Sequence, residues 1–88
     1  MAETYLNHPN FGLLTRICEI EDGRSLFTTL YAYRLFFTID QSNGGVRFES
    51  VTRNTAKVLV ENRLRMLRRG GDGHECDRLQ MVYKRTFA

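Results

Sequence analysis

Two histidines and two cysteines are the side chains of this 88-residue sequence that are most suited to binding a metal ion. His74 and Cys76 are separated by one residue, whereas His8 and Cys18 lie ten positions apart. A structural zinc site normally takes ligands at short spacing from two segments of the chain, and only one such pair is present here. We therefore expect ordinary packed cysteines and exposed or interface histidines, with no metal and no other cofactor.

Neither the acidic residues nor the glycines form a pattern typical of a catalytic site. Glu19, Glu21 and Asp22 gather at a predicted turn, where solvation of the carboxylates explains them. Glycines within 70–73 follow a predicted helix and lack the Gly-Lys-Ser/Thr ending of a phosphate-binding loop. A chain of this length buries only about 60 to 65% of its unfolded surface, which leaves little material for a deep active site. We expect a protein that acts through its surface and is not an enzyme.

The charge is unevenly distributed along the chain. The net charge of +3 combines four basic and six acidic side chains up to Glu49 with nine basic and four acidic ones from Ser50 onward. Such a division suggests two surfaces with different partners. The cysteines form no CxxC motif, residues 1–10 are polar, and no apolar stretch approaches the roughly 20 residues of a membrane span. These features predict a cytoplasmic protein that does not enter a membrane.

The sequence up to Glu49, which we call the acidic half, has patterns that predict β-strands. An apolar run over 11–20 precedes Asp22-Gly23, a dipeptide suited to a hairpin turn. The segment 25–39 is rich in aromatic and β-branched residues but is too long for one ordinary strand, so it either bends or forms two strands. Asn43-Gly44-Gly45 predicts a further turn into a last strand, or pair of strands, over 46–51. A small, strongly coiled barrel accommodates either option.

The sequence from Ser50 onward, which we call the basic half, has a periodicity that predicts two helices. Thr52 or Asn54 can cap the first helix, and the glycines of 70–73 end it. A second helix is predicted from His74, so that the two helices pack as an antiparallel hairpin. Arg63 falls inside the apolar arc of the first helix, and we expect it along a seam, with its guanidinium paired to a carboxylate or a carbonyl. The apolar arc of the first helix is formed by Ala56, Leu59, Val60, Leu64, Met66 and Leu67.

The opposite face of the first helix is strongly basic. Its residues are Arg53, Lys57, Arg65, Arg68 and Arg69. These side chains could neutralise phosphates, so a small Tudor- or SH3-like nucleic-acid-binding module is an alternative reading. The face offers no pattern of base-reading residues, and basic residues near a helix C-terminus also complement the helix dipole. We favour a solvated or protein-facing surface and expect no direct contact with nucleic acid.

Aromatic residues of the acidic half form the most informative candidate site. They are more numerous than an incomplete small barrel can easily enclose, and Arg34 lies among them. Phe27, Leu30 and one of the pair Phe36 and Phe37 are expected in the core. Tyrosine and arginine carry much of the binding energy at protein interfaces, so the segment from Tyr31 to Leu35 is a candidate interface.

Several strings in the same order make the sequence similar to the PipX family, small cyanobacterial regulators that interact with the signalling protein PII. The strings span most of the chain: Tyr5-Leu6-Asn7-His8-Pro9, Phe11-Gly12-Leu13-Leu14, Leu30-Tyr31-Ala32-Tyr33-Arg34-Leu35-Phe36-Phe37, Asn62-Arg63-Leu64-Arg65-Met66-Leu67-Arg68-Arg69 and Thr86-Phe87. The resemblance implies an α+β fold, with a small five-stranded Tudor-like (SH3-like) β-barrel over 1–53 followed by a C-terminal antiparallel two-helix hairpin over 54–88.

The resemblance also implies partner exchange in place of chemistry. Members of the family bind the dimeric transcription factor NtcA and coactivate it when 2-oxoglutarate is abundant. ADP-bound PII, a trimer, sequesters them through its T-loops when 2-oxoglutarate is low. Both partners use largely the same barrel surface, and the helices project away from NtcA, where RNA polymerase or another regulator could bind.

The partner surface transfers to this sequence position by position. Tyr31 and Leu35 are expected as apolar anchors, and Arg34 as a hydrogen-bond donor to a partner carboxylate or carbonyl. Tyr33 replaces a glutamine of the family pattern and Thr15 replaces an aromatic residue. The expected partner-binding residues are Glu3, Tyr5, His8, Phe11, Asp22, Tyr31, Tyr33, Arg34, Leu35 and Phe37.

Overall fold

A computed structural model of the chain describes residues 5–30, 35–41 and 44–87. Five strands precede two helices, as the family resemblance implies, and the segment 25–39 contains parts of two strands. The first strand was not recognised from periodicity, because it is only four residues long. The elements in chain order are β1 (Tyr5–His8), β2 (Gly12–Glu21), β3 (Arg24–Thr29), β4 (Phe36–Asp40), β5 (Arg47–Val51), α1 (Arg53–Gly70) and α2 (Gly73–Phe87).

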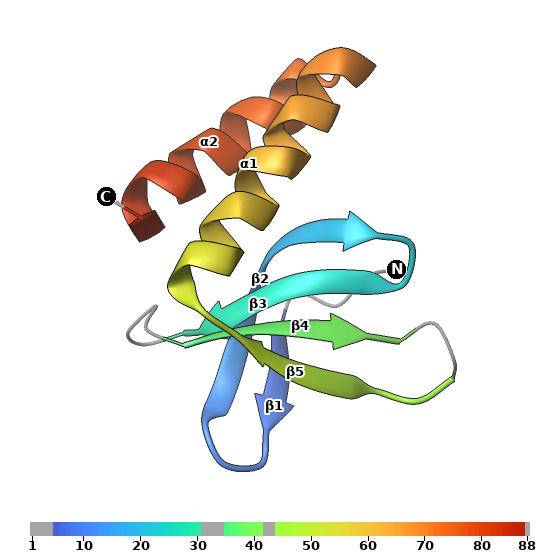
Figure 1. The fold of residues 1–88 in the computed structure, drawn as a ribbon, viewed down its shortest axis with the longest axis vertical. Helices are drawn as coiled ribbons and strands as arrows, with labels where there is room; N and C mark the ends of the chain where they lie inside the picture. Colours follow the sequence, from blue (N-terminus) through green and yellow to red (C-terminus); the bar gives the residue numbers. More distant parts are fainter. Residues whose placement is uncertain (1–4, 31–34, 42–43, 88) are drawn as a thin grey trace.

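The strands form one antiparallel sheet in the order β1-β2-β3-β4-β5, which curls into a half-barrel (Figure 1). The long strand β2 pairs with both β1 and β3, and its pairing with β3 shifts between Arg16 and Cys18 and again between Glu19 and Glu21. Such irregularities bend a strand and increase its twist. The curl brings the ring of His8 on β1 within 5.1 Å of the ring of Phe48 on β5, at the two ends of the strand order.

Each face of the sheet covers a separate core, because successive strand residues point to opposite faces. The inner face of the half-barrel buries Leu14, Phe27, Phe37 and Ile39, with Leu6 and Phe48 packed against them. The other face packs against the helices. Phe36 and Phe37 are therefore both core residues, although the sequence led us to expect only one of them there. The second core consists of Cys18, Leu26, Phe36, Ala56, Val60, Leu64, Leu67, Cys76, Leu79 and Phe87.

Local hydrogen bonds define the helix ends. Thr52 is the N-cap of α1, and its side chain accepts a hydrogen bond of 3.1 Å from the backbone N–H of Thr55. Gly71 ends α1 with a positive φ of 78°, a conformation that glycine adopts without strain. Asp72 then accepts a hydrogen bond of 3.1 Å from the backbone N–H of Glu75 and so caps the start of α2. The predicted turn between two antiparallel helices is confirmed.

The buried face of α1 is narrower than the predicted arc. Its buried residues are Ala56, Val60, Leu64 and Leu67, which span about 80° of the helix at 100° per residue. Met66 lies at the edge of the predicted arc and is 54% exposed, so this edge of the arc does not belong to the buried face. Arg63 borders the buried face and is half-buried. The two helices are also joined by a hydrogen bond of 2.6 Å that Tyr83 donates to Glu61.

The helical hairpin lies on one side of the sheet, and its turn is at the end away from the strands (Figure 1). Only Thr52 separates β5 from α1, beside the expected boundary at residue 53. The division into domains 1–53 and 54–88 stays a prediction, because the sheet and the helices share the second core. In the described part of the chain, neither helix is long and apolar enough to cross a bilayer.

Candidate functional site

The turn between β1 and β2 is closed by a side chain. His8 accepts two backbone hydrogen bonds at Nδ1, one from the N–H of Asn10 at 3.0 Å and one from the N–H of Phe11 at 3.3 Å. Gly12 follows with a positive φ of 76°, which favours glycine at this position. The imidazole acts on the turn much as an Asn or Asp side chain does in other turns. It therefore fixes the backbone that carries Phe11.

The same imidazole lies at the centre of an aromatic group. Its ring centroid is 4.9 Å from that of Phe11 and 5.1 Å from those of Phe37 and Phe48, and Phe11 lies 5.6 Å from Phe37. These separations are typical of favourable aromatic pairs. Phe11 is still 49% exposed, although its ring packs against those of His8 and Phe37. An exposed aromatic side chain is thus held in place before any partner arrives.

Phe37 does not have the role that the family pattern implied. It is only 3% exposed, because it faces the inside of the half-barrel opposite Phe27 on β3. A partner cannot reach this side chain without disrupting the core. We correct its assignment from a contact residue to a residue that supports His8 and Phe11.

The base of the loop between β3 and β4 is fixed at the same end of the sheet. The carbonyl oxygen of Leu35 accepts hydrogen bonds from the Thr28 hydroxyl at 2.8 Å and from the Thr29 N–H at 3.2 Å. Leu30 donates to the carbonyl oxygen of Leu13 at 3.1 Å, which ties the loop to the beginning of β2. Leu35 itself is 40% exposed. His8, Phe11 and Leu35 therefore lie at the same end of the sheet. Together with Tyr5 at the start of β1, they form the set of predicted residues that we call the aromatic end.

Tyr5 contributes the outer side of the aromatic end. It pairs with Thr15, whereas its neighbour Leu6 pairs with the buried Leu14, so alternation turns Tyr5 away from the inside of the half-barrel. It is 54% exposed. Asp22 lies in the turn at the opposite end of β2 and is not brought to the aromatic end. Glu3, Tyr31, Tyr33 and Arg34 lie outside the described residues.

Sequence reasoning missed Phe48, which is half-buried on β5 and forms one wall around His8. It also missed the capping role of His8. The signal that could have suggested a rigid turn was the spacing of Pro9 and Gly12 around Asn10 and Phe11. No local pattern, however, connects His8 with a phenylalanine that lies 40 residues away.

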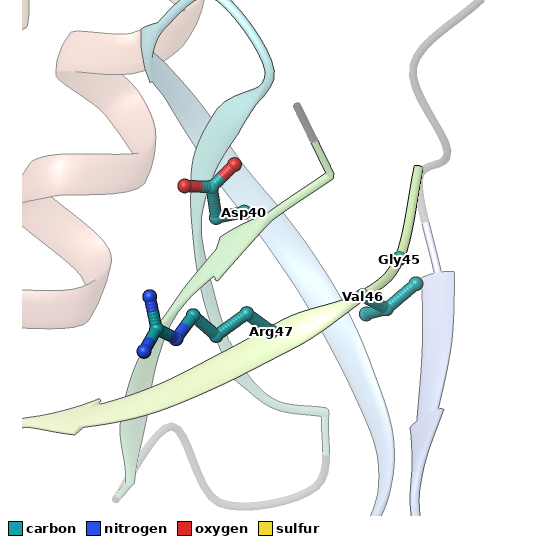
Figure 2. A pocket seen from close by; sticks show the side chains of 4 residues that line it. All are labelled: Asp40, Gly45, Val46 and Arg47. Carbon is teal, nitrogen blue, oxygen red and sulfur yellow. The ribbon is translucent and has the colours of Figure 1, made fainter. Parts of the chain in front are cut away.

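A shallow hollow of about 220 Å³ lies at the other end of β4 and is lined by Asp40, Gly45, Val46 and Arg47 (Figure 2). Asp40 and Arg47 are cross-strand partners, so their side chains leave the same face of the sheet. Of the predicted site residues that the structure describes, none lines this hollow. A search of the described residues finds no group of three or more His, Cys, Asp or Glu side chains that could hold a metal ion.

An exposed phenylalanine on a fixed turn and an exposed tyrosine on the neighbouring strand, on a curled five-stranded sheet backed by two helices, are typical of a small protein-interaction module. The sequence comparison gives the family within that class. The chain belongs to the PipX family, because the family model described as PII-interacting protein X matches residues 2–87. The match includes all five strands and both helices. The comparison with curated proteins found no match.

Proposed function

We propose that this protein is a non-enzymatic, cytoplasmic regulator of nitrogen-responsive transcription that exchanges between two protein partners. The observation that carries the proposal is the family match over residues 2–87, whose description names PII as a partner. In the proposed cycle, ADP-bound PII sequesters the protein when 2-oxoglutarate is low. The protein binds and coactivates NtcA when 2-oxoglutarate is high.

The aromatic end supports the proposal because it offers apolar area at a small entropic cost. Tyr5, Phe11 and Leu35 are 54%, 49% and 40% exposed, and the backbone of each is held by a strand or by hydrogen bonds. Ordering flexible groups is a principal cost of association, and a surface that is already ordered avoids much of it. Leu30 and Leu35, which flank Tyr31 and Arg34 in the sequence, are held by hydrogen bonds at the same end of the sheet.

If PII and NtcA compete for one surface of the protein, their concentrations and affinities determine how the protein is divided between them. A metabolite that changes how well PII or NtcA displays its own contact surface redistributes the protein between them. The protein need not bind 2-oxoglutarate itself. Glu3 and Tyr33 stay proposed contacts of the same partners, and Asp22 is a proposed contact at the opposite end of β2. The basic helices remain available for RNA polymerase or another regulator.

The structure gives the nucleic-acid alternative no additional support. All five basic residues of the α1 face are exposed, but two of them have local interactions. The guanidinium of Arg53 lies 5.5 Å from the ring centroid of Phe87, and Arg65 donates a hydrogen bond to Asn62. Direct DNA binding would require the isolated protein to shift duplex DNA with an affinity that falls steeply as salt rises.

A competition pull-down tests the proposal. PII should capture the protein in the presence of ADP and release it on addition of ATP and 2-oxoglutarate, while NtcA should capture it under the second condition. Phe11→Ala should weaken at least one complex by about 1 to 3 kcal/mol, as loss of an aromatic anchor does. Met81→Ala is a matched control, because Met81 is 72% exposed but lies on α2. PII binding that ignores the effectors would refute the proposed exchange.

A further inference from the structure

A cleft of about 280 Å³ lies between β2 and the beginning of α2, outside the aromatic end. Its walls are formed by Arg16 and Ile17 of β2 and by Glu75 and Arg78 of α2. The Nε atom of Arg16 is buried and has no hydrogen-bond partner. A buried donor without an acceptor costs free energy, so this arginine favours a ligand that brings oxygen acceptors.

Positive charge exceeds negative charge around this cleft. Glu75 is the carboxylate in its wall, and it pairs with Arg78 at 3.6 Å. Arg63 of α1 lies near the same seam, since Arg63, Arg16 and Glu75 all act electrostatically on the thiol of Cys18. Within the described ranges, neither Arg16 nor Arg63 forms an ion pair. The expected pairing of Arg63 with a carboxylate or a carbonyl is therefore absent from this part of the chain.

We propose that this cleft is a binding site for a small divalent oxyanion of the phosphate class. Arg16 and Arg78 would donate hydrogen bonds from opposite walls, because a guanidinium matches the spacing of two oxygens on such an ion. Arg63 does not line the cleft, but its charge acts on the same Cys18 thiol as that of Arg16 and would add to the positive potential near the site. The cleft is smaller than the roughly 300 to 1,000 Å³ of most pockets for larger ligands, which favours an ion of a few atoms.

Binding at this site would join the sheet to the helical hairpin. Arg16 belongs to β2 and Arg78 to α2. An ion that binds only when these elements are assembled stabilises their arrangement by mass action. The inference is independent of the proposed partner exchange, because it concerns neither the aromatic end nor any protein partner.

NMR of the arginine side-chain Nε–H groups, with inorganic phosphate as the probe, tests the site. Phosphate is titrated at constant ionic strength, with sodium chloride as the balancing salt. We expect the Arg16 and Arg78 signals to shift with a common, saturable curve that is half-complete at roughly 1 to 10 mM phosphate, the strength expected of a few charge-assisted hydrogen bonds. Sodium chloride alone should leave both signals in place.

Two charge-matched variants decide the outcome. Arg78→Gln should weaken phosphate binding at least fivefold and should leave the fold intact, because the Arg78 side chain is 70% exposed. Arg85→Gln removes the same charge from an exposed position about two turns further along α2 and should change the affinity less than twofold. A linear shift without saturation, or equal affinities of Arg78→Gln and the unmodified protein, would overturn the proposed site.

Discussion

Ionisation of Cys18 should make the stability of this protein depend on alkaline pH. Burial raises the pKa of the Cys18 thiol from 9.0 to about 12, and the nearby Arg63 and Arg16 only partly oppose this. The folded protein therefore keeps the thiol protonated where the unfolded chain releases the proton. The stabilisation is fully present below the unfolded pKa of 9.0 and is lost as the pH rises toward the folded pKa of about 12.

The size of the effect follows from the two pKa values. One pKa unit corresponds to about 1.4 kcal/mol, so at about pH 10.5 the unfolded state should gain about 2 kcal/mol from ionisation of this one thiol. That loss is a large fraction of the stability of a small domain, for which about 5 kcal/mol is a typical lower value. Cys18→Ala removes the ionisable group and keeps the position apolar.

Urea unfolding of both proteins at about pH 8 and pH 10.5, with a reducing agent, measures the effect. The difference between the two proteins isolates Cys18, because every other titrating group is common to both. The stability advantage of the cysteine protein over Cys18→Ala should shrink by about 2 kcal/mol at the higher pH. If the difference in free energy of unfolding between the two proteins is the same at both pH values, the Cys18 thiol is accessible to water. The packing described for Cys18 between the sheet and the helices would then be wrong.

Three further measurements test other parts of the structure. His8→Phe keeps a ring but loses the acceptor for two backbone N–H groups, whereas His8→Asn keeps an acceptor but loses the ring. Each variant should lower the free energy of unfolding by about 1 to 2 kcal/mol. If neither variant changes it, the described turn is contradicted. The hydrogen bond to Glu61 raises the pKa of Tyr83, so ultraviolet titration should show one tyrosine ionising at lower pH in Glu61→Gln, and an unchanged titration would rule out the contact. Phe36→Ala should cost about 3 to 5 kcal/mol in chemical denaturation, because Phe36 is 2% exposed, and a loss below 1 kcal/mol would be inconsistent with its central place in the core.

Local chemistry made much of the fold predictable. The turn at Asp22-Gly23 was predicted from two residues that tolerate positive φ, and Gly23 indeed has φ of 74°. The end of α1 was predicted in the same way from the glycines that follow it. The strand β1 was missed because four residues with polar Asn7 and His8 carry no clear pattern. Its place depends on pairing with β2, which is a property of the folded chain.

The sequence predicted which types of residue form the candidate site, but it did not predict which of them are exposed. Phe11 and Phe37 are both phenylalanines of the same family pattern, yet one is 49% exposed and the other 3%. Which of them faces outward depends on the strand register and on the curl of the sheet, and neither can be read from neighbouring residues. The role of His8 likewise depends on rings contributed by β4 and β5.

The adjacent residues Phe36 and Phe37 have a consequence for how the chain folds. One ring enters the core beneath the helices and the other enters the half-barrel, so a single peptide bond links the two cores. Loosening either core displaces the strand that serves both, and we expect the sheet and the hairpin to melt in one cooperative transition. A fragment ending at residue 53 would leave Leu26 and Phe36 uncovered, and an apolar surface of that kind favours aggregation. The helices are thus part of what keeps the strand half of the molecule in solution.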